Sequence, residues 1–328
     1  MLLYQNPLEV SFLIVRSIAV AGIAHAQTIT LRAADNQPAD YPTVQGLMAM
    51  AEYLEAASAG RITMEVFPGG QLGDERSTIE QVQLGVLDVV RTSTSPVGEF
   101  YAPMGVYSLP FIFRDAAHFW KVVQGPIGRE LLDGLEAAGM IGLAYYDSGS
   151  RNFYTTDRPI RSVADLQGLR IRTQQSQVVL DMMEALGADA VPMAFGEVYS
   201  GLQTGVIDGA ENNFPSYGPF GVRHYEVAPY YTLNQHARIP EIVMISTTTW
   251  NSLNPEDQAL VREAALASVP VQAALWADLV ERSRQAVEEA GSEIITADIQ
   301  EFQDAMAPVY EQYAPQFGDL LQRIQGTE

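Results

Sequence analysis

The order of apolar and polar positions predicts short strands that alternate with helices along most of the chain. Leu47, Met50 and Leu54 recur at helical spacing, whereas the residues from Ile62 to Phe67 alternate as in a half-buried strand. Runs of this kind predict strands at 29–34, 62–67, 86–90, 141–146, 169–172 and 242–246, and helices at 44–57, 75–84, 177–186 and 197–202. Strands alternating with helices predict an α/β fold whose sheets are mainly parallel and covered by helices.

A long helical pattern stands out near the C-terminus. Asn254 has the character of an N-cap, Pro255 suits the first helical position, and the pattern continues to Ala290. Such a helix is about 54 Å long at 1.5 Å per residue, which exceeds one small domain. We therefore expect it to span two lobes, with a kink at Pro270. The sequence shows no internal repeat.

The N-terminal residues resemble an export signal. An apolar run from Ser17 to Ala24 follows Arg16, and Ala24-His25-Ala26 forms an A-x-A cleavage pattern. We expect residues 1–26 to be a signal peptide cleaved near Ala26, and the mature chain to be periplasmic. An N-terminal helix that stays attached is the alternative.

Composition excludes several classes of protein. The chain has 328 residues, with 40 Asp and Glu against 19 Lys and Arg, so its formal net charge is −21. Nucleic-acid binding requires clustered basic residues, and we expect no nucleic-acid partner. The absence of cysteine excludes disulfides, thiolate metal sites and cysteine nucleophiles.

No motif in the sequence demands catalysis. The four histidines have no metal-ligand spacing, and no phosphate-binding glycine loop or nucleophile elbow occurs. We therefore expect no catalytic residue, metal or cofactor. Asp74 and Glu75 are adjacent carboxylates, but acids are common at a helix N-terminus. An exported enzyme that uses Asp74 and Glu75, or His236, stays open as an alternative.

Three polar clusters follow predicted strands in the second half of the chain, at 148–152, 170–176 and 208–213. In open α/β sheets, ligands bind beyond the carboxyl ends of the strands. Arg170 and Arg172 alternate on one strand and therefore face opposite sides. We expect Arg172 to reach a cleft and Arg170 to face solvent or an acidic partner.

The clusters also carry a resemblance to a known family. The segments "SGSRNFY", "GLRIRTQQS" and "GVIDGAENN" resemble the signature regions of solute-binding proteins of TRAP (tripartite ATP-independent periplasmic) transporters. The similarity extends through "FPGGQLGDERSTIEQVQLGVLDV" and covers nearly all of the mature chain. It implies an α/β, two-lobed periplasmic-binding-protein-like fold with mixed, mainly parallel sheets and the long kinked helix spanning both lobes.

Within the family, an Arg at the position of Arg172 pairs with the carboxylate of the substrate. The resemblance gives Arg151 and Asn212 supporting contacts to the ligand. A planar guanidinium can hold a carboxylate through two parallel hydrogen bonds, which agrees with this role. The implied function is a receptor for a small organic acid that closes by hinge motion and delivers its ligand to the TRAP membrane permease subunits.

The remaining polar side chains favour a hexuronate or a related sugar acid as the ligand, because amide, carboxylate and imidazole groups can form hydrogen bonds with hydroxyls. The further candidate ligand contacts are Glu75, Asn36, Gln37, Arg91, Ser93, Asn213, His236, Phe195 and Tyr217. A C4-dicarboxylate receptor and a sensory receptor stay open as alternatives. We expect a monomer with one lobe formed by 27–149 and 238–277, and the other by 150–237 and 278–328.

Overall fold

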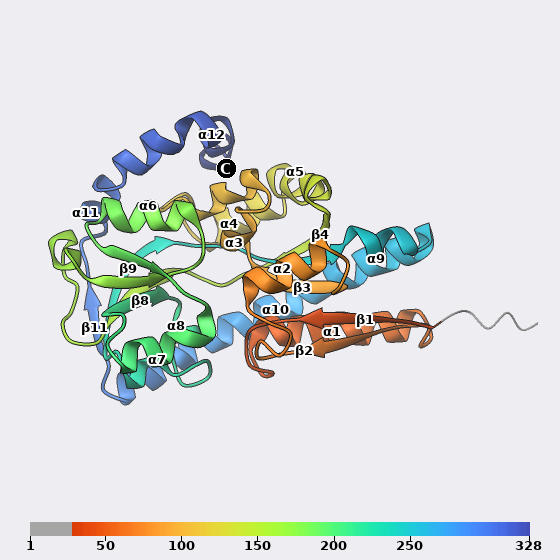
Figure 1. The fold of residues 1–328 in the computed structure, drawn as a ribbon, viewed down its shortest axis with the longest axis horizontal. Helices are drawn as coiled ribbons and strands as arrows, with labels where there is room; N and C mark the ends of the chain where they lie inside the picture. The colour runs from red at the N-terminus through yellow and green to blue at the C-terminus, as the bar shows by residue number, and fades with distance from the viewer. Residues whose placement is uncertain (1–27) are drawn as a thin grey trace, which may run out of the picture.

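The computed structural model describes residues 28–328, so the predicted signal peptide at 1–26 lies outside the described part of the chain. Two mixed sheets with surrounding helices form two lobes (Figure 1). This confirms the expected α/β, two-lobed architecture. No helix within 28–328 combines the length and the hydropathy needed to cross a bilayer.

The first lobe is built on a five-stranded sheet of order β2-β1-β3-β10-β4, in which only β10 runs antiparallel to its neighbours. Its strands are β1 (Ile29–Ala34), β2 (Ile62–Phe67), β3 (Val89–Ser93), β4 (Met140–Tyr146) and β10 (Glu241–Ser246). Its helices are α1 (Pro42–Ala57), α2 (Glu75–Gln83), α3 (Thr94–Val97), η1 (Ala102–Ser108), α4 (Ala116–Val123), α5 (Pro126–Gly134), η2 (Leu135–Ala138) and α9 (Thr247–Ser252).

The second lobe is built on a six-stranded sheet of order β11-β9-β5-β8-β6-β7. Its strands are β5 (Arg151–Thr155), β6 (Arg170–Thr173), β7 (Asp189–Pro192), β8 (Gly209–Asn212), β9 (Tyr230–Ala237) and β11 (Glu293–Thr296). Its helices are η3 (Val163–Leu166), α6 (Gln177–Ala185), η4 (Phe195–Glu197), α7 (Val198–Gln203), α8 (Phe214–Tyr217), η5 (His224–Glu226) and α11 (Ile299–Asp304).

The two lobes share one βαβαβ unit, although the sequence itself shows no internal repeat. β1, β2 and β3 pair in the order 2-1-3, and β6, β7 and β8 pair in the equivalent order 7-6-8. In each unit an Asp side chain accepts a hydrogen bond from the backbone of the central strand, Asp88 from Arg32 and Asp208 from Arg170. The two units share their strand order and the position of this Asp, features that inspection of the sequence does not reveal.

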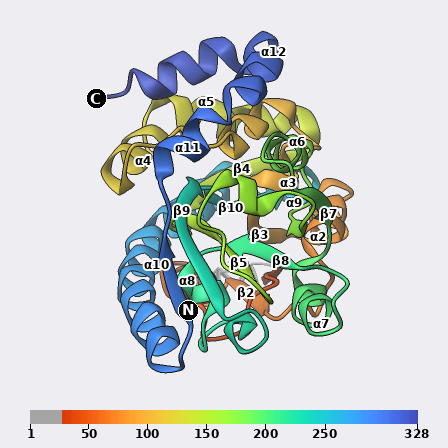
Figure 2. The ribbon, with the colours of Figure 1, turned by 90° about the vertical axis from the view of Figure 1, so that its left-hand side faces the viewer.

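The helix α10 (Pro255–Glu289) confirms the long helical prediction and ends one residue earlier than expected. The side chain of Asn254 caps it by accepting a hydrogen bond from the backbone of Asp257. The helix packs on α1 and β4 of the first lobe and on α8 of the second, and Figure 2 shows it beside α8. It continues through Pro270, which donates no backbone hydrogen bond.

The C-terminal helix α12 (Ala307–Gln325) does not belong to one lobe alone. It packs on α6 of the second lobe and also on α5 and η1 of the first. Figure 1 shows α12 lying across the top of the molecule. Apolar side chains from both lobes join one continuous core, including Tyr107, Phe153 and Phe317. The lobes are therefore in close contact in this structure.

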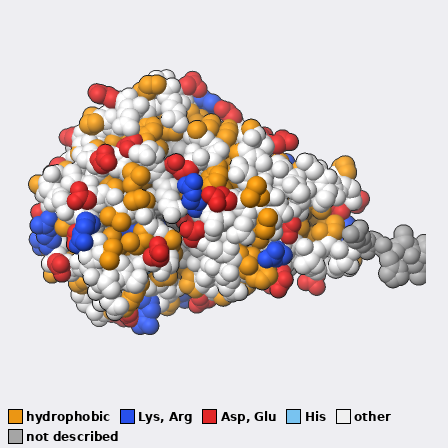
Figure 3. Space-filling model, viewed as in Figure 1, with side chains coloured by type: hydrophobic (Ala, Val, Ile, Leu, Met, Phe, Trp, Pro, Cys, Tyr) orange, Lys and Arg blue, Asp and Glu red, His pale blue; other side chains and the backbone are white. Residues whose placement is uncertain are grey.

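The outer surface carries the acidic excess. Figure 3 shows acidic side chains scattered over the visible face, with few basic ones and no large basic patch. Several exposed ion pairs join residues one helical turn apart, such as Arg76 with Glu80. Such exposed pairs contribute little to stability, at most about 1 kcal/mol each.

Candidate functional site

A polar pocket lies between the two lobes, where strands and loops of both sheets end. Its lining combines charged, amide and hydroxyl side chains with few apolar ones: Asn36, Gln37, Tyr41, Thr43, Glu75, Arg91, Ser148, Arg151, Arg172, Gln174, Phe195, Asn212, Asn213, Ser216 and Glu241. The first lobe supplies the loop after β1, the first turns of α1 and α2, the middle of β3 and the first residue of β10. The second supplies β5, the ends of β6 and β8, and the start of α8.

Arg91 is fixed by acidic partners on the first-lobe side. Its Nε donates to Asp35 at 2.7 Å and its Nη1 donates to Glu241 at 2.6 Å, while Nη2 donates to Asn36 at 2.8 Å. The guanidinium is 2% exposed. Burial lowers the pKa of Arg91, although the neighbouring Glu241 opposes this shift. Its charge is therefore neutralised within the protein.

Arg151 is likewise neutralised on the second-lobe side. Its Nε and Nη2 donate to the two carboxylate oxygens of Glu211 at 2.5 and 2.8 Å. Burial would raise the pKa of Glu211, but Arg151 and a hydrogen bond with His236 outweigh it and lower that pKa to about 2. Arg151 lines the pocket, and Glu211 lies behind it as its bidentate partner.

Arg172 is the lining arginine that has no carboxylate partner among residues 28–328. Its Nε and Nη2 both donate to the backbone carbonyl of Met193, at 2.9 and 2.8 Å. This contact occupies one edge of the guanidinium. The other edge, formed by Nη1 and the second Nη2 hydrogen, keeps the fork that suits a carboxylate. Arg172 is 3% exposed and also lies 5.8 Å from the ring centroid of Phe195.

Arg170 behaves as expected from its alternate position on β6. It is exposed, and its guanidinium pairs with Asp208 through Nε at 3.0 Å and Nη2 at 2.5 Å. The two arginines of one strand therefore have different surroundings, which makes Arg170 a natural control for Arg172.

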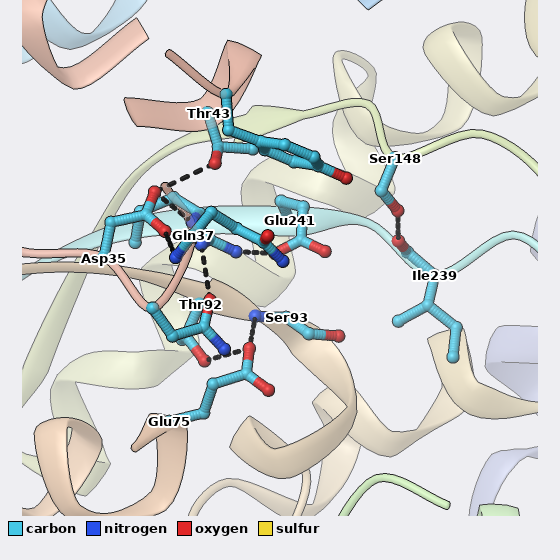
Figure 4. A network of polar contacts seen from close by, with 12 residues as sticks. Asp35, Gln37, Thr43, Glu75, Thr92, Ser93, Ser148, Ile239 and Glu241 are labelled. Atoms are coloured by element: carbon cyan, nitrogen blue, oxygen red, sulfur yellow. Dashed lines mark hydrogen bonds and ion pairs between the residues drawn. The ribbon is translucent and has the colours of Figure 1, made fainter. Parts of the chain in front are cut away.

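Glu75 enters the pocket from the first turn of α2. The residue is partly exposed, but its carboxylate points inward (Figure 4). Its Oε1 accepts from the backbone of Ser93 at 2.9 Å and from the Thr92 hydroxyl at 3.1 Å. Burial, followed by the repulsion of Glu241, raises the pKa of Glu75. Its neighbour Asp74 instead caps α2 by accepting from the backbone of Ser77.

Several polar groups in the pocket lack partners. The amide oxygens of Gln37 and Gln174 are buried and accept no hydrogen bond from any side chain or backbone within 28–328. A buried acceptor without a donor costs free energy, so both positions favour a ligand that donates. Hydroxyl groups are donors of this kind.

Asn212 and Asn213 also shape the pocket. Asn213 caps α8 by accepting from the backbone of Ser216, and its amide donates to the carbonyl of Ser148 at 2.9 Å. The side-chain oxygen of Asn212 accepts from the backbone of Asn213. Both side chains line the pocket, although much of their hydrogen-bonding capacity orders the turn between β8 and α8.

Three predicted ligand contacts are placed outside the pocket lining. Ser93 is buried at the start of α3, where its hydroxyl caps the helix. His236 stacks on Phe153 with ring centroids 4.6 Å apart, and its Nε2 forms a hydrogen bond with the Glu211 carboxylate. Tyr217 belongs to an apolar cluster, and its hydroxyl donates to the carbonyl of Ala228. The structure does not bring these three side chains into the site.

The other predicted contacts do meet in the lining, together with residues that sequence analysis missed. The missed lining residues are Tyr41, Thr43, Ser148, Gln174, Ser216 and Glu241. Asp35 and Glu211 lie directly behind them as ion-pair partners. The position of Asp35 and Tyr41 in the polar loop after β1 was the available signal. Nothing in the sequence marked Glu241, which opens an apolar strand.

Two larger cavities lie elsewhere along α10, and the second of them shares Asn213 with the interlobe pocket. One of about 490 Å³ lies against α10 near Pro270 and is mainly apolar, with Trp120, Leu143 and Leu266 in its lining. A second, of about 480 Å³, lies beside Trp276 and Arg238. The first has one charged side chain in its lining, Arg129, and the second has Asp147, Arg238 and Arg284, against five in the interlobe pocket. No group of His, Asp or Glu within 28–328 is arranged to hold a metal ion.

Two α/β lobes that enclose a buried polar pocket with one unneutralised guanidinium define a two-lobed solute-binding protein. The chain belongs to the family described as bacterial extracellular solute-binding protein, family 7, whose model matches residues 33–316. Proteins of this TRAP type bind small acids and work with a membrane permease.

Solved structures of relatives cover almost the whole chain. A TRAP periplasmic solute-binding protein from Bradyrhizobium sp., in complex with α/β-D-galacturonate, is 48% identical with a TM-score of 0.89, covering 91% of this chain and all of that one. One from Pseudomonas putida with bound D-glucuronate is 42% identical with a TM-score of 0.89, covering 92% and 98%. A solute-binding protein from Chromohalobacter salexigens is 36% identical over 92% of this chain and 91% of its own.

Proposed function

We propose that this receptor binds a hexuronate such as galacturonate or glucuronate and delivers it to a TRAP permease. The observation that carries the proposal is the free edge of the Arg172 guanidinium inside a pocket whose other arginines already have carboxylate partners. The two relatives whose structures hold galacturonate and glucuronate support this choice of ligand.

The carboxylate of the ligand would pair with Arg172, and the sugar ring would lie against Phe195. Charge-assisted hydrogen bonds contribute about 1.5–3 kcal/mol each. Because micromolar affinity requires about −8 kcal/mol, further contacts are needed. We assign these to the ring hydroxyls, which would donate to the amide oxygens of Gln37 and Gln174 and form a hydrogen bond with the carboxyl group of Glu75. Asn36, Asn212 and Asn213 would supply the amide contacts at the rim.

A C4-dicarboxylate fits this pocket less well, because its second carboxylate would need a second free cation. Arg91 is held by Asp35 and Glu241, and Arg151 is held by Glu211. A second ligand carboxylate would also approach Glu75. Bringing an unpaired charge into such a site is costly.

We further propose that the chain catalyses no reaction. Asp74 is engaged as a helix cap, and His236 is stacked behind the pocket, so neither is placed to act on a ligand. Galacturonate recovered unaltered after prolonged incubation with the protein would support this assignment, whereas conversion to a product would overturn it.

The working unit we propose is an exported monomer whose signal peptide ends near Ala26. Both walls of the pocket come from one chain, which supports a monomer. We place the lobe boundaries at the crossings between β4 and β5 and between β9 and β10, with α10 as the third connection.

A thermal-shift screen tests the ligand class. Galacturonate and glucuronate should stabilise the protein by about 2.7 kcal/mol at one hundred times their dissociation constants. Succinate and malate at the same concentrations should shift the melting temperature little. Stabilisation by the dicarboxylates but not by the hexuronates would overturn the proposed ligand class.

A further inference from the structure

The charges of the closed pocket do not balance. Four carboxylates face three guanidinium groups in the pocket and directly behind it, which leaves a formal charge of −1 before any ligand enters. These groups are Asp35, Glu75, Glu211, Glu241, Arg91, Arg151 and Arg172. An acidic ligand would raise the imbalance to −2 in a space that closure shields from water.

Pairing within this set isolates Glu75 and Arg172. Arg91 satisfies Asp35 and Glu241, and Arg151 satisfies Glu211. Among residues 28–328, the Glu75 carboxylate accepts from two neutral donors of β3, the Thr92 hydroxyl and the Ser93 backbone. No guanidinium of this part of the chain forms an ion pair with it.

Charged groups surround Glu75 on every side. Asp74 and Arg76 flank it on α2, Arg91 lies on β3 and Glu241 on β10. Arg172 faces it from β6 across the interlobe space, and its positive charge partly offsets the burial that raises the pKa of Glu75. Figure 4 shows Glu75 beneath Ser93 and Thr92, with Glu241 farther along the same site.

A ligand carboxylate on Arg172 would cancel the positive charge that faces Glu75 from the second lobe. We propose that binding of a hexuronate is coupled to the uptake of one proton by the Glu75 carboxylate. The proton comes from solvent and forms an O–H bond on a carboxylate oxygen. The resulting carboxylic acid can donate a hydrogen bond to a ligand oxygen, and the pocket returns to a charge of −1. This inference rests on the proposed function.

His236 is the competing site for the proton. It faces Glu211 through Nε2 at 3.3 Å and Asn234 through Nδ1 at 3.2 Å, and it lies behind Arg151. Burial lowers the pKa of His236, despite the opposing influence of Glu211. A ligand on Arg172 does not contact this ring, so we assign the proton to Glu75.

Titration calorimetry with galacturonate and glucuronate tests the coupling. Measurements between pH 5.5 and 8 in buffers of different ionisation enthalpy give the number of protons taken up per ligand. We expect uptake that approaches one proton, and an affinity that falls by up to about tenfold per pH unit as pH rises between the pKa values of Glu75 in the free and bound protein. Below the pKa of Glu75 in the free protein, the affinity should not depend on pH.

Two variants locate the proton. Glu75→Gln imitates the protonated acid, so its affinity should no longer depend on pH. Glu80→Gln removes an exposed carboxylate from the same helix and should keep the slope of the wild-type protein. If Glu75→Gln fails to fold, the buffer series on the wild-type protein still measures proton uptake and tests the coupling.

Tight binding by the wild-type protein without proton uptake would overturn the coupling and leave the proposed function intact. A pH slope that persists in Glu75→Gln would also overturn it, because the proton would then reside on another group such as His236. Failure of both hexuronates to bind at any pH would overturn the proposed function together with this inference.

Discussion

At the scale of single residues, the buried ion pair of Arg151 and Glu211 is the clearest test of the site's architecture. We predict that Arg151→Met lowers the free energy of unfolding by about 3–5 kcal/mol, because Glu211 would be left as an unpaired buried charge. Urea denaturation measures the change. The double variant Arg151→Met/Glu211→Met should recover most of the loss, since replacing both partners removes the buried charge. A double variant less stable than the single one would contradict this account.

The same pair predicts a dependence of stability on pH. The pKa of Glu211 is lowered to about 2 in the folded protein and is about 4.3 in an unfolded chain. The folded state therefore gains stability from this carboxylate above about pH 4.3, and loses it as pH falls toward 2. Urea titrations between pH 2.5 and 6 should show a smaller pH dependence in the double variant than in the wild-type protein. Equal slopes would contradict the lowered pKa.

Sequence reasoning identified the arginines but not which of those in the pocket have carboxylate partners within the protein. The alternation on β6 separated Arg172 from Arg170, and the structure confirms that Arg170 pairs with Asp208. The sequence did not show that Arg91 and Arg151 are neutralised while Arg172 is not, because their acidic partners are distant in the chain. Glu211 lies 60 residues from Arg151, and Glu241 lies 150 residues from Arg91.

At the scale of elements, replacing a glycine by alanine should lower the free energy of unfolding in one helix and raise it in another. A Cβ at Gly46 of α1 would lie 2.8 Å from the ring of Tyr146, which a hydrogen bond to Ser268 of α10 holds in place at 2.6 Å. A Cβ at Gly318 of α12 would meet nothing within 4 Å. We predict that Gly46→Ala lowers the free energy of unfolding by about 1–3 kcal/mol through overpacking.

The matched variant Gly318→Ala should raise the free energy of unfolding by about 0.5–1 kcal/mol, because alanine has the higher helix propensity. Thermal and urea unfolding of both variants would measure whether the free energy of unfolding falls or rises. Stabilisation by Gly46→Ala would show that α1 does not pack closely on Tyr146.

Elements with a clear apolar period were predictable, and those made of polar residues were not. The strands β1 and β2 have the predicted bounds, and the predicted helix ends lie within two residues of those observed. The strand expected at 86–90 begins instead at Val89 and continues through Arg91 to Ser93. Its polar end is buried by ion pairs across the sheet, which local patterning cannot reveal. β5 was missed for the same reason, since Arg151 and Asn152 resemble a surface loop in sequence.

At the scale of the whole molecule, a direct hydrogen bond joins the two lobes beside the pocket. The hydroxyl of Tyr41 in the first lobe lies 2.8 Å from the hydroxyl of Ser216 in the second. We predict that Tyr41→Phe weakens hexuronate binding about fivefold, because the closed form loses one buried hydrogen bond of about 1 kcal/mol. Small-angle scattering of the ligand-free Tyr41→Phe variant should show a larger radius of gyration than that of the ligand-free wild-type protein.

The control for this prediction is Tyr53→Phe. The Tyr53 hydroxyl donates to Glu263 at 2.6 Å between α1 and α10, away from the interlobe pocket. This variant should keep the wild-type affinity and radius of gyration. Equal effects of the two variants would contradict a closure role for Tyr41.

The measurement that tests the central claim most directly compares Arg172→Ala with Arg170→Ala in titrations with galacturonate and glucuronate. The two arginines lie on one strand, but Arg172 presents a free guanidinium edge to the pocket and Arg170 pairs with Asp208 at the surface. We predict that Arg172→Ala loses about 2–4 kcal/mol of binding free energy, about 30- to 1,000-fold in affinity, and that Arg170→Ala binds as the wild-type protein does. An unchanged affinity in Arg172→Ala would contradict the carboxylate clamp on which the proposed function depends.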